Sequence, residues 1–121
     1  MIAMRAVDVV QPDVCYLGGL TRTLRVAAMA QAAGLPVTPH SANLSMVTVF
    51  TLHMVGAIAG AGPYVEFSIE GTDYYPWQDG IFAPALVVRD GKVRIPAGPG
   101  WGVEIRPAWL DRATRQSSEL G

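Results

Sequence analysis

The stretch DVVQPDVCYLGG, from Asp8 to Gly19, joins an apolar run to a polar triplet and a glycine pair. The β-branched residues before Gln11 show no clean alternation, which is typical of a buried strand in a parallel sheet. Gly18 and Gly19 then interrupt the apolar pattern. The stretch therefore predicts a strand that ends at an acidic side chain, Asp13, and a turn into the next element.

Two further strand-like stretches follow: LPVTPH, which ends at His40, and PYVEFSI, which contains Glu66. Helical patterns separate the three stretches, and such an alternation predicts parallel strands joined by right-handed crossovers. The expected strands lie near residues 7–13, 36–40 and 63–68. The fold class indicated by this order is α/β.

The two intervening segments have the residue spacing of helices. The first runs through TLRVAAMAQAAG; Thr21 or Thr23 can cap it, and Gly34 ends it, as glycine commonly does at a helix C-terminus. Ser45 is the expected cap of the second helix. One face of that helix carries mainly apolar side chains, namely Val47, Phe50, Thr51, Met54 and Ile58.

Three polar side chains, Asp13, His40 and Glu66, stand late in their strands at nearly equal intervals along the chain. In a parallel sheet or barrel, the C-terminal ends of the strands share one rim, and that rim carries active sites. Neighbouring strands lie about 4.8 Å apart, so a carboxylate and an imidazole at matching heights can form a hydrogen bond. The spacing therefore predicts that the three side chains lie together on one rim.

Each of these residues also has an ordinary structural explanation. An aspartate after a proline, such as Asp13, is commonly a turn or cap residue, and His40 also follows a proline. A functional role is more strongly indicated for Glu66, because burying a carboxylate without a partner costs free energy of folding. Ser41 and Asn43 follow His40 and can either contact substrate hydroxyls or cap the next helix.

Composition narrows the class of protein. Half of the 121 residues are hydrophobic and only 16% are charged, which indicates a folded core rather than a disordered chain. The net charge of −1 offers no basic surface for nucleic acid. The longest apolar-rich stretch, residues 46–61, is too short and too mixed for a membrane span. The single cysteine, Cys15, and the lack of a long apolar N-terminal region favour a reducing, cytoplasmic location.

Taken together, these motifs resemble the C-terminal barrel of the enolase superfamily, in its mandelate racemase and muconate lactonizing branch. The matching features are the QPD strand end, the GG-x-T turn, the alanine-rich helix and the PH strand end. PYVEF is similar to the eighth barrel strand of that family. LVVRDGKVRIPAGPGWGVEI is similar to the tail that follows the barrel and packs on an N-terminal capping domain. The likeness covers about residues 5–111.

The resemblance implies the C-terminal portion of a TIM-type (β/α)7β barrel, comprising about three strand–helix units. Residues 1–72 would form these units, and residues 73–121 would form the tail, with a hairpin near 86–105. Because a complete barrel needs about 200 residues or more, we expect a fragment that lacks the N-terminal half of the barrel and the capping domain. The open edges of such a fragment predict a homo-oligomer.

The resemblance also implies roles for the rim residues in removing a proton α to a carboxylate. His40 matches the general base and Asp13 its dyad partner. Glu66 matches a neutral acid that hydrogen-bonds the developing enolate, and a partly apolar setting between Tyr64, Val65 and Phe67 can keep it protonated. The family uses Mg²⁺ to stabilise the enolate; its ligands are expected upstream, and none is expected within this chain.

These roles imply a small carboxylate or sugar acid as substrate. An acid-sugar dehydratase is favoured, because a His–Asp dyad can act as a base and can also protonate a leaving hydroxyl. A racemase, epimerase or cycloisomerase of the same family is the alternative. A hypothesis of another class is a truncated half-barrel that has no catalytic activity and only self-associates.

Overall fold

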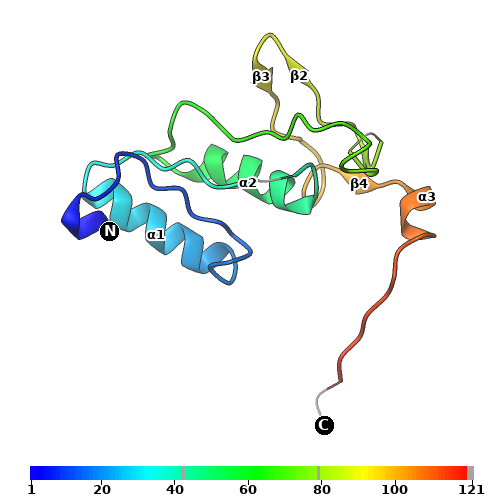
Figure 1. Cartoon of the computed structure of the whole chain (residues 1–121), viewed down its shortest axis with the longest axis horizontal. Coiled ribbons are helices and arrows are strands. Elements are labelled where there is room, and N and C mark those ends of the chain that lie inside the picture. The colour runs from blue at the N-terminus through cyan, green and yellow to red at the C-terminus, as the bar shows by residue number, and fades with distance from the viewer. Residues whose placement is uncertain (42, 79, 120–121) are drawn as a thin grey trace.

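The computed structural model describes residues 1–41, 43–78 and 80–119, and two helices dominate it (Figure 1). Helix α1 spans Leu20–Ala32 and helix α2 spans Met46–Ala57, and a single 3-10 turn, η1 (Ile2–Met4), precedes them. Three extended segments, residues 7–13, 35–41 and 60–68, alternate with the two long helices. Within the described residues, no helix has the length and apolar character needed to cross a membrane.

The second extended segment lies between the other two and runs parallel to both. Val37 forms a parallel bridge with Val10 on one side and with Ala61 on the other. The Val10 N–H donates to the Pro36 carbonyl at 3.0 Å, and the Thr38 N–H donates to the Val10 carbonyl at 3.0 Å. The chain directions are those of consecutive parallel strands joined through helices.

At these positions the described residues form isolated bridges rather than the regular strands that the sequence predicts. Proline has no N–H to donate, so it interrupts a ladder wherever it occurs. The three segments contain Pro12, Pro36, Pro39 and Pro63. The result is an irregular parallel layer with little regular β-structure.

Helix α1 begins at Leu20, two residues earlier than a cap at Thr21 would require and four earlier than a cap at Thr23. Its N-cap is Gly19, with φ of 106°, a conformation that suits glycine. Thr23 lies inside the helix, fully buried, and its hydroxyl donates to the Gly19 carbonyl at 3.0 Å. The prediction that Thr21 or Thr23 caps the helix was therefore wrong. Gly34, with φ of 69°, follows the end of the helix as expected.

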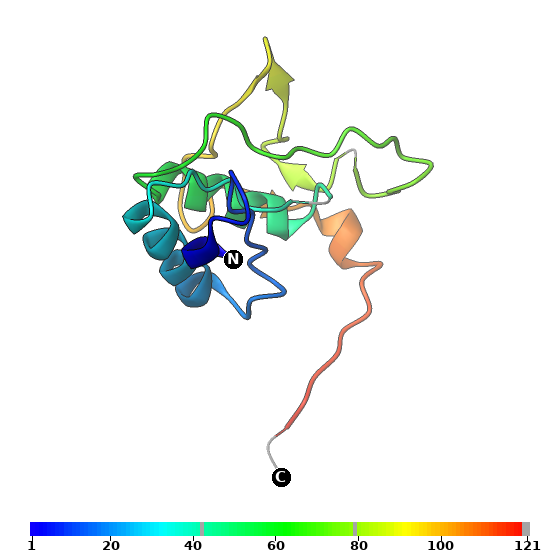
Figure 2. The same ribbon diagram turned by 60° about the vertical axis from the view of Figure 1, so that its left-hand side comes forward.

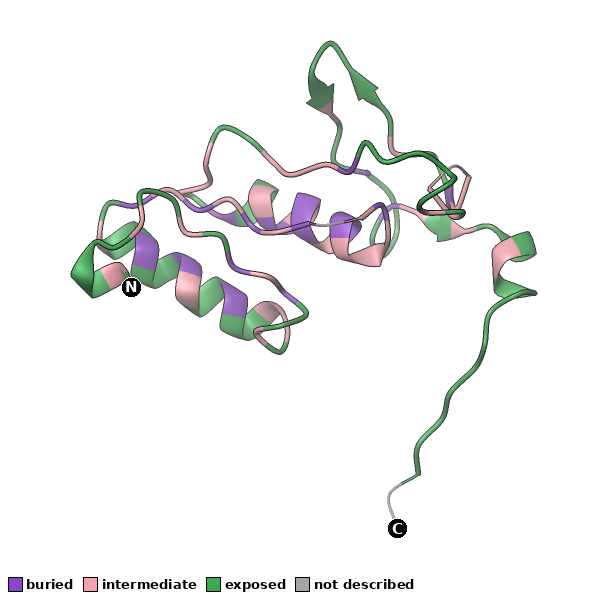
Figure 3. Ribbon diagram, in the orientation of Figure 1, coloured by how far each residue is buried: buried purple, intermediate pink, exposed green. Residues whose placement is uncertain are grey.

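Helix α2 is capped by Ser45, as predicted: its hydroxyl accepts the Val47 N–H at 3.3 Å. The helix is buried over more than one face (Figure 3). The buried residues are Thr48, Val49, Thr51, Leu52 and Met54. A helix buried this widely must be covered by more than one layer.

The main core forms where α1, α2 and the extended segments meet. Small residues on α1 let the neighbouring elements approach, and the larger apolar side chains come from the second extended segment, from the turn before α1 and from the C-terminal end of α2. Its buried members are Val14, Ala27, Ala30, Leu35, Val37, Met54 and Ile58. This cluster fixes α1 and α2 on the extended layer and so positions the loops that precede each helix.

The tail contains two nested antiparallel pairs. Strand β1 (Phe82–Ala83) pairs with β4 (Glu104–Ile105), and the hairpin of β2 (Val88–Arg89) and β3 (Lys92–Val93) lies between them in the sequence. The short helix α3 (Pro107–Leu110) follows. The chain then extends away from the body of the structure (Figure 2).

The tail covers the second face of α2 through Trp101. The Trp101 ring lies 4.7 Å from that of Phe50, and its carbonyl lies 2.9 Å from His53 Nε2. His53 is thus a packing residue that joins α2 to the tail. This contact partly covers the face of α2 that carries Phe50 and His53.

Candidate active site

The parallel register places Asp13 beside His40. The backbone N–H of His40 donates to the Pro12 carbonyl at 3.0 Å. This bond fixes the ends of the first and second extended segments at the same height. Each segment then turns toward the N-terminal end of its helix. The strand ends of neighbouring parallel units thus share one rim, as the sequence spacing predicts.

Asp13 uses its two carboxylate oxygens for different purposes. Oδ1 accepts the N–H groups of Cys15 at 2.7 Å and Tyr16 at 3.0 Å, so it closes a local turn. Oδ2 lies 2.7 Å from His40 Nδ1. Burial by itself would raise the pKa of Asp13, but the hydrogen bonds from His40 and from the two amides outweigh it, so the pKa lies below its ordinary value.

His40 presents its second ring nitrogen to the open side of the rim. Asp13 accepts a hydrogen bond at Nδ1, so the neutral imidazole carries its proton there and leaves a lone pair on Nε2. Nε2 lies 3.8 Å from Glu66 Oε2. The His40 side chain is 32% exposed, so part of the imidazole is open to solvent.

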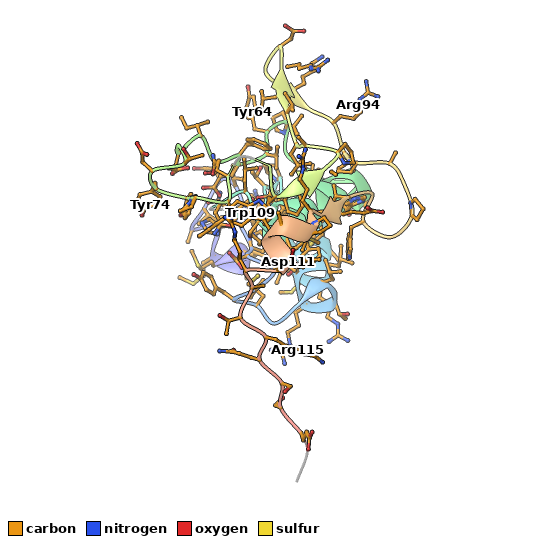
Figure 4. All side chains as sticks on the ribbon, turned by 90° about the vertical axis from the view of Figure 1, so that its right-hand side faces the viewer. Tyr64, Tyr74, Arg94, Trp109, Asp111 and Arg115 are labelled. Atoms are coloured by element: carbon orange, nitrogen blue, oxygen red, sulfur yellow. The ribbon has the colours of Figure 1, made fainter. Side chains whose placement is uncertain are left out.

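Glu66 reaches the same rim from the third extended segment. Its Oε2 accepts the Ser41 N–H at 2.8 Å, and Oε1 makes no hydrogen bond within the part of the chain that the structure describes. The side chain is 39% exposed, and Tyr64 lies at the outer surface, 80% exposed (Figure 4). Tyr64 therefore does not take part in the predicted apolar setting of Glu66, and this chain leaves the carboxylate partly open to solvent.

Ser41 and Asn43 do not present their side chains in the way that the sequence suggests. Ser41 is fully buried, and its hydroxyl lies 2.9 Å from that of Thr48. The Asn43 Oδ1 atom is buried and has no hydrogen-bond partner among the described residues, while its carbonyl accepts the Thr48 hydroxyl. Neither residue caps α2, since Ser45 does so.

Sequence reasoning missed two residues that the structure brings to this site, Thr48 and Thr51. Both are fully buried on α2. The Thr51 hydroxyl lies 3.3 Å from the His40 carbonyl. The sequence signal for both is a hydroxyl on an otherwise apolar helix, because buried polar groups need hydrogen-bond partners. The helical spacing by itself places Thr51 only on a packing face.

The described residues do not assemble a metal site of their own. No group of three or more His, Cys, Asp or Glu side chains among them could hold a metal ion. The oxygens of Asp13 are already shared between two amides and an imidazole. We therefore assign no metal ligand to the described part of the chain.

Comparison with known proteins places the chain in a family. The family model described as enolase C-terminal domain-like matches residues 1–109. The chain is 31% identical, over 102 residues, to an arabinonate dehydratase of Saccharolobus solfataricus, covering 84% of this chain and 26% of that protein.

Solved structures resemble the chain in the same way. A "putative racemase" from Roseobacter denitrificans is 63% identical, with a TM-score of 0.89, over 99% of this chain and 33% of its own. L-Talarate dehydratase from Polaromonas sp. JS666, complexed with Mg and L-glucarate, is 28% identical, with a TM-score of 0.73, over 99% of this chain and 30% of its own. The chain thus spans about a quarter to a third of the length of these relatives, and it matches the C-terminal portion of their barrel domains.

Proposed function

The chain belongs to the enolase superfamily, to the C-terminal domain-like region of its mandelate racemase/muconate lactonizing branch, and from this premise we propose that it carries the acid–base rim of an acid-sugar dehydratase. The observation that supports this most directly is the 2.7 Å hydrogen bond between Asp13 Oδ2 and His40 Nδ1. It leaves Nε2 of His40 free to accept a proton and facing Glu66.

In this proposal His40 is the base that removes the proton α to the substrate carboxylate. The proton moves to Nε2, and the imidazole becomes an imidazolium. Asp13 holds the Nδ1 proton and stabilises the positive charge that develops on the ring. Because Asp13 is itself fixed by two amide N–H groups, the imidazole is held in one orientation before substrate binds.

Glu66 acts beside the imidazole, on the same rim. Its Oε2 is anchored by Ser41 and lies 3.8 Å from His40 Nε2, and a proton carried on Oε1 donates a hydrogen bond to a substrate carboxylate oxygen as enolate charge develops. The imidazolium then returns its proton to the hydroxyl that leaves from the adjacent carbon. Water departs, and an enol remains that converts to a keto acid.

The arabinonate and L-talarate dehydratases among the relatives support a sugar acid as substrate. The Mg-bound L-talarate dehydratase also supports a magnesium ion in the complete enzyme. The described residues do not fit a magnesium site, so we propose that the ligands lie in the rest of the barrel, outside this chain. The capping domain would come from the same source, and we expect the 121-residue chain without these parts to form a homo-oligomer through its open edges.

A racemase is the second candidate, because the Roseobacter denitrificans relative is described as a "putative racemase" and is 63% identical. The two reactions share the first proton transfer. They differ in what happens to the enolate, which loses a hydroxide as water in one case and is reprotonated in the other. Product analysis therefore separates them without any change to the roles of Asp13 and His40.

The test is turnover of a panel of sugar acids by the full-length protein with Mg²⁺ in D₂O. A dehydratase forms a keto acid, whereas a racemase incorporates deuterium at the α carbon without loss of water. His40→Asn should abolish both signals. His53→Asn is the matched control, because His53 contacts the Trp101 carbonyl away from the rim, and it should keep wild-type turnover. Activity that survives His40→Asn unchanged would overturn the proposal.

A further inference from the structure

The peptide unit that joins His40 to Ser41 is hydrogen-bonded at both of its ends. Its carbonyl oxygen, on His40, accepts the Thr51 hydroxyl at 3.3 Å. Its N–H, on Ser41, donates to Glu66 Oε2 at 2.8 Å. This planar group therefore links Thr51, a buried residue of α2, to His40 and Glu66, the two rim residues that face each other.

Thr51 reaches out of its own helix to make this contact. A threonine inside a helix ordinarily bonds the carbonyl four residues earlier, and Thr23 of α1 does so with Gly19 at 3.0 Å. Both threonines are fully buried. The different partner of Thr51 is therefore a feature of its position and not of the residue type.

A second pair of hydroxyls holds the other side of the same peptide. The Thr48 hydroxyl donates to the Asn43 carbonyl, so the Ser41 hydroxyl is the donor in its 2.9 Å contact with Thr48. Ser41 is thus fixed through its side chain while its N–H points to Glu66. Together, Thr48 and Thr51 leave the peptide plane little freedom to rotate.

We propose that Thr51 is a positioning residue of this rim: its hydroxyl sets the plane of the His40–Ser41 peptide, and that plane aims the Glu66 carboxylate at the space beside the His40 imidazole. A peptide is planar and stiff, so a bond to its carbonyl also fixes the direction of its N–H. A donor on the carbonyl also polarises the peptide and strengthens the N–H as a donor. The catalytic part of this inference rests on the proposed function, whereas the structural part does not.

The structural part is tested by amide hydrogen exchange of Ser41 in the full-length protein. Thr51→Val removes the hydroxyl at nearly constant volume and should speed exchange at the Ser41 amide by roughly tenfold or more. Thr51→Ser keeps a hydroxyl and should restore protection. Thr23→Val, which removes an equally buried hydroxyl from α1, should leave the Ser41 amide unchanged. Equal exchange of Ser41 in the wild type and Thr51→Val, or an equal increase in Thr23→Val, would overturn the proposal.

The catalytic part is tested by a double-mutant cycle with Glu66. Thr51→Val should lower kcat by roughly 10- to 100-fold with little change in KM, because misplacement of a reacting group by about 1 Å has an effect of that size. The same substitution made together with Glu66→Ala should have less than about a threefold effect, since the group that it positions is gone. An undiminished effect in the Glu66→Ala background would overturn the inference. If the wild type has no activity on any acid in the panel, the proposed function fails, and the Ser41 amide result still decides the role of Thr51.

Discussion

Asp13 and His40 are joined by a 2.7 Å hydrogen bond between Oδ2 and Nδ1, while Oδ1 of the same aspartate holds the amides of Cys15 and Tyr16. Asp13 is therefore a turn residue and a dyad partner at once. The turn that it closes is what keeps its second oxygen directed at the imidazole. The sequence allowed Asp13 to be either a turn residue or the partner of His40, and in the structure it is both.

The first prediction concerns Asp13→Asn. The amide oxygen can still close the turn with Cys15 and Tyr16, but its NH₂ group would face His40 Nδ1 and force the imidazole proton onto Nε2. The base would then be blocked in its neutral form, so α-proton exchange should fall by about 10²- to 10⁴-fold. The midpoint of thermal unfolding should change little. A variant that exchanges the α proton at the wild-type rate would show that Asp13 does not set the tautomer.

A comparison of Glu66→Gln with Glu66→Ala tests the role of the second carboxylate. Glutamine can accept the Ser41 N–H and still donate a hydrogen bond to the substrate, so part of the activity should remain. Alanine loses both contacts and should cost more, by roughly a further tenfold. The measurement is kcat for each variant on the acid that the wild type turns over. Equal and negligible losses in both variants would assign Glu66 a purely structural role.

Stability should depend on pH through Asp13. Its pKa in the folded protein lies below the ordinary value of 3.8, so the unfolded chain binds the proton more tightly than the folded one does. The contribution of Asp13 is therefore fully present above about pH 4 and is lost as the pH falls through the lower folded-state pKa. Urea unfolding between about pH 5 and pH 3 should show a shallower loss of stability in Asp13→Asn. Asp73→Asn, at an exposed turn carboxylate, should keep the wild-type slope; identical slopes for all three proteins would contradict the prediction.

Because Gly102 lies close to Pro96, we expect the stability of the tail to be sensitive to a side chain at position 102. Gly102 has φ of 71°, and an added Cβ would lie 2.7 Å from the Pro96 carbonyl carbon. Gly102→Ala should therefore lower the free energy of unfolding by roughly 2–4 kcal/mol, from the left-handed backbone and from the overlap. Gly100 has φ of 60° with nothing within 4 Å, so Gly100→Ala should cost only about 1–2 kcal/mol. Chemical denaturation compares the two, and equal losses would show that the contact with Pro96 is unimportant.

The open edge of the first extended segment predicts that the isolated 121-residue chain associates. Val10 bonds the second segment, so its neighbours Val9 and Gln11 turn their backbone groups to the free edge. Val9 and Tyr16 are 46% and 88% exposed beside it. Sedimentation should show species heavier than a monomer, and Val9→Lys should reduce them, because a charged edge resists pairing. Val88→Lys, at an equally exposed position of the hairpin, should not; a wild-type monomer at all concentrations would refute the prediction.

Local sequence was enough to identify the order of the elements and the residues of the rim. Several of these features depend only on neighbouring residues, so a short window of sequence predicts them. They are the Ser45 cap, the end of α1 near Gly34 and the polar residues after each apolar run. Asp13 and His40 could be paired in advance because the parallel register follows from the order of strands and helices. The same spacing placed Glu66 on the rim, and only its role as an acid beside the enolate required the resemblance to a family.

The tertiary structure alone decided how the backbone of the rim is held. The turn before α1 placed Gly19 rather than Thr21 or Thr23 at the cap, because the chain enters this helix with a positive φ. The exposure of Glu66 and the burial of the Ser41 hydroxyl depend on which segments cover them, and sequence periodicity does not record that. The contact of Thr51 with His40 could not be predicted from the sequence for the same reason. A buried hydroxyl bonds whatever acceptor packing brings within reach, and the His40 carbonyl is brought to Thr51 by the fold.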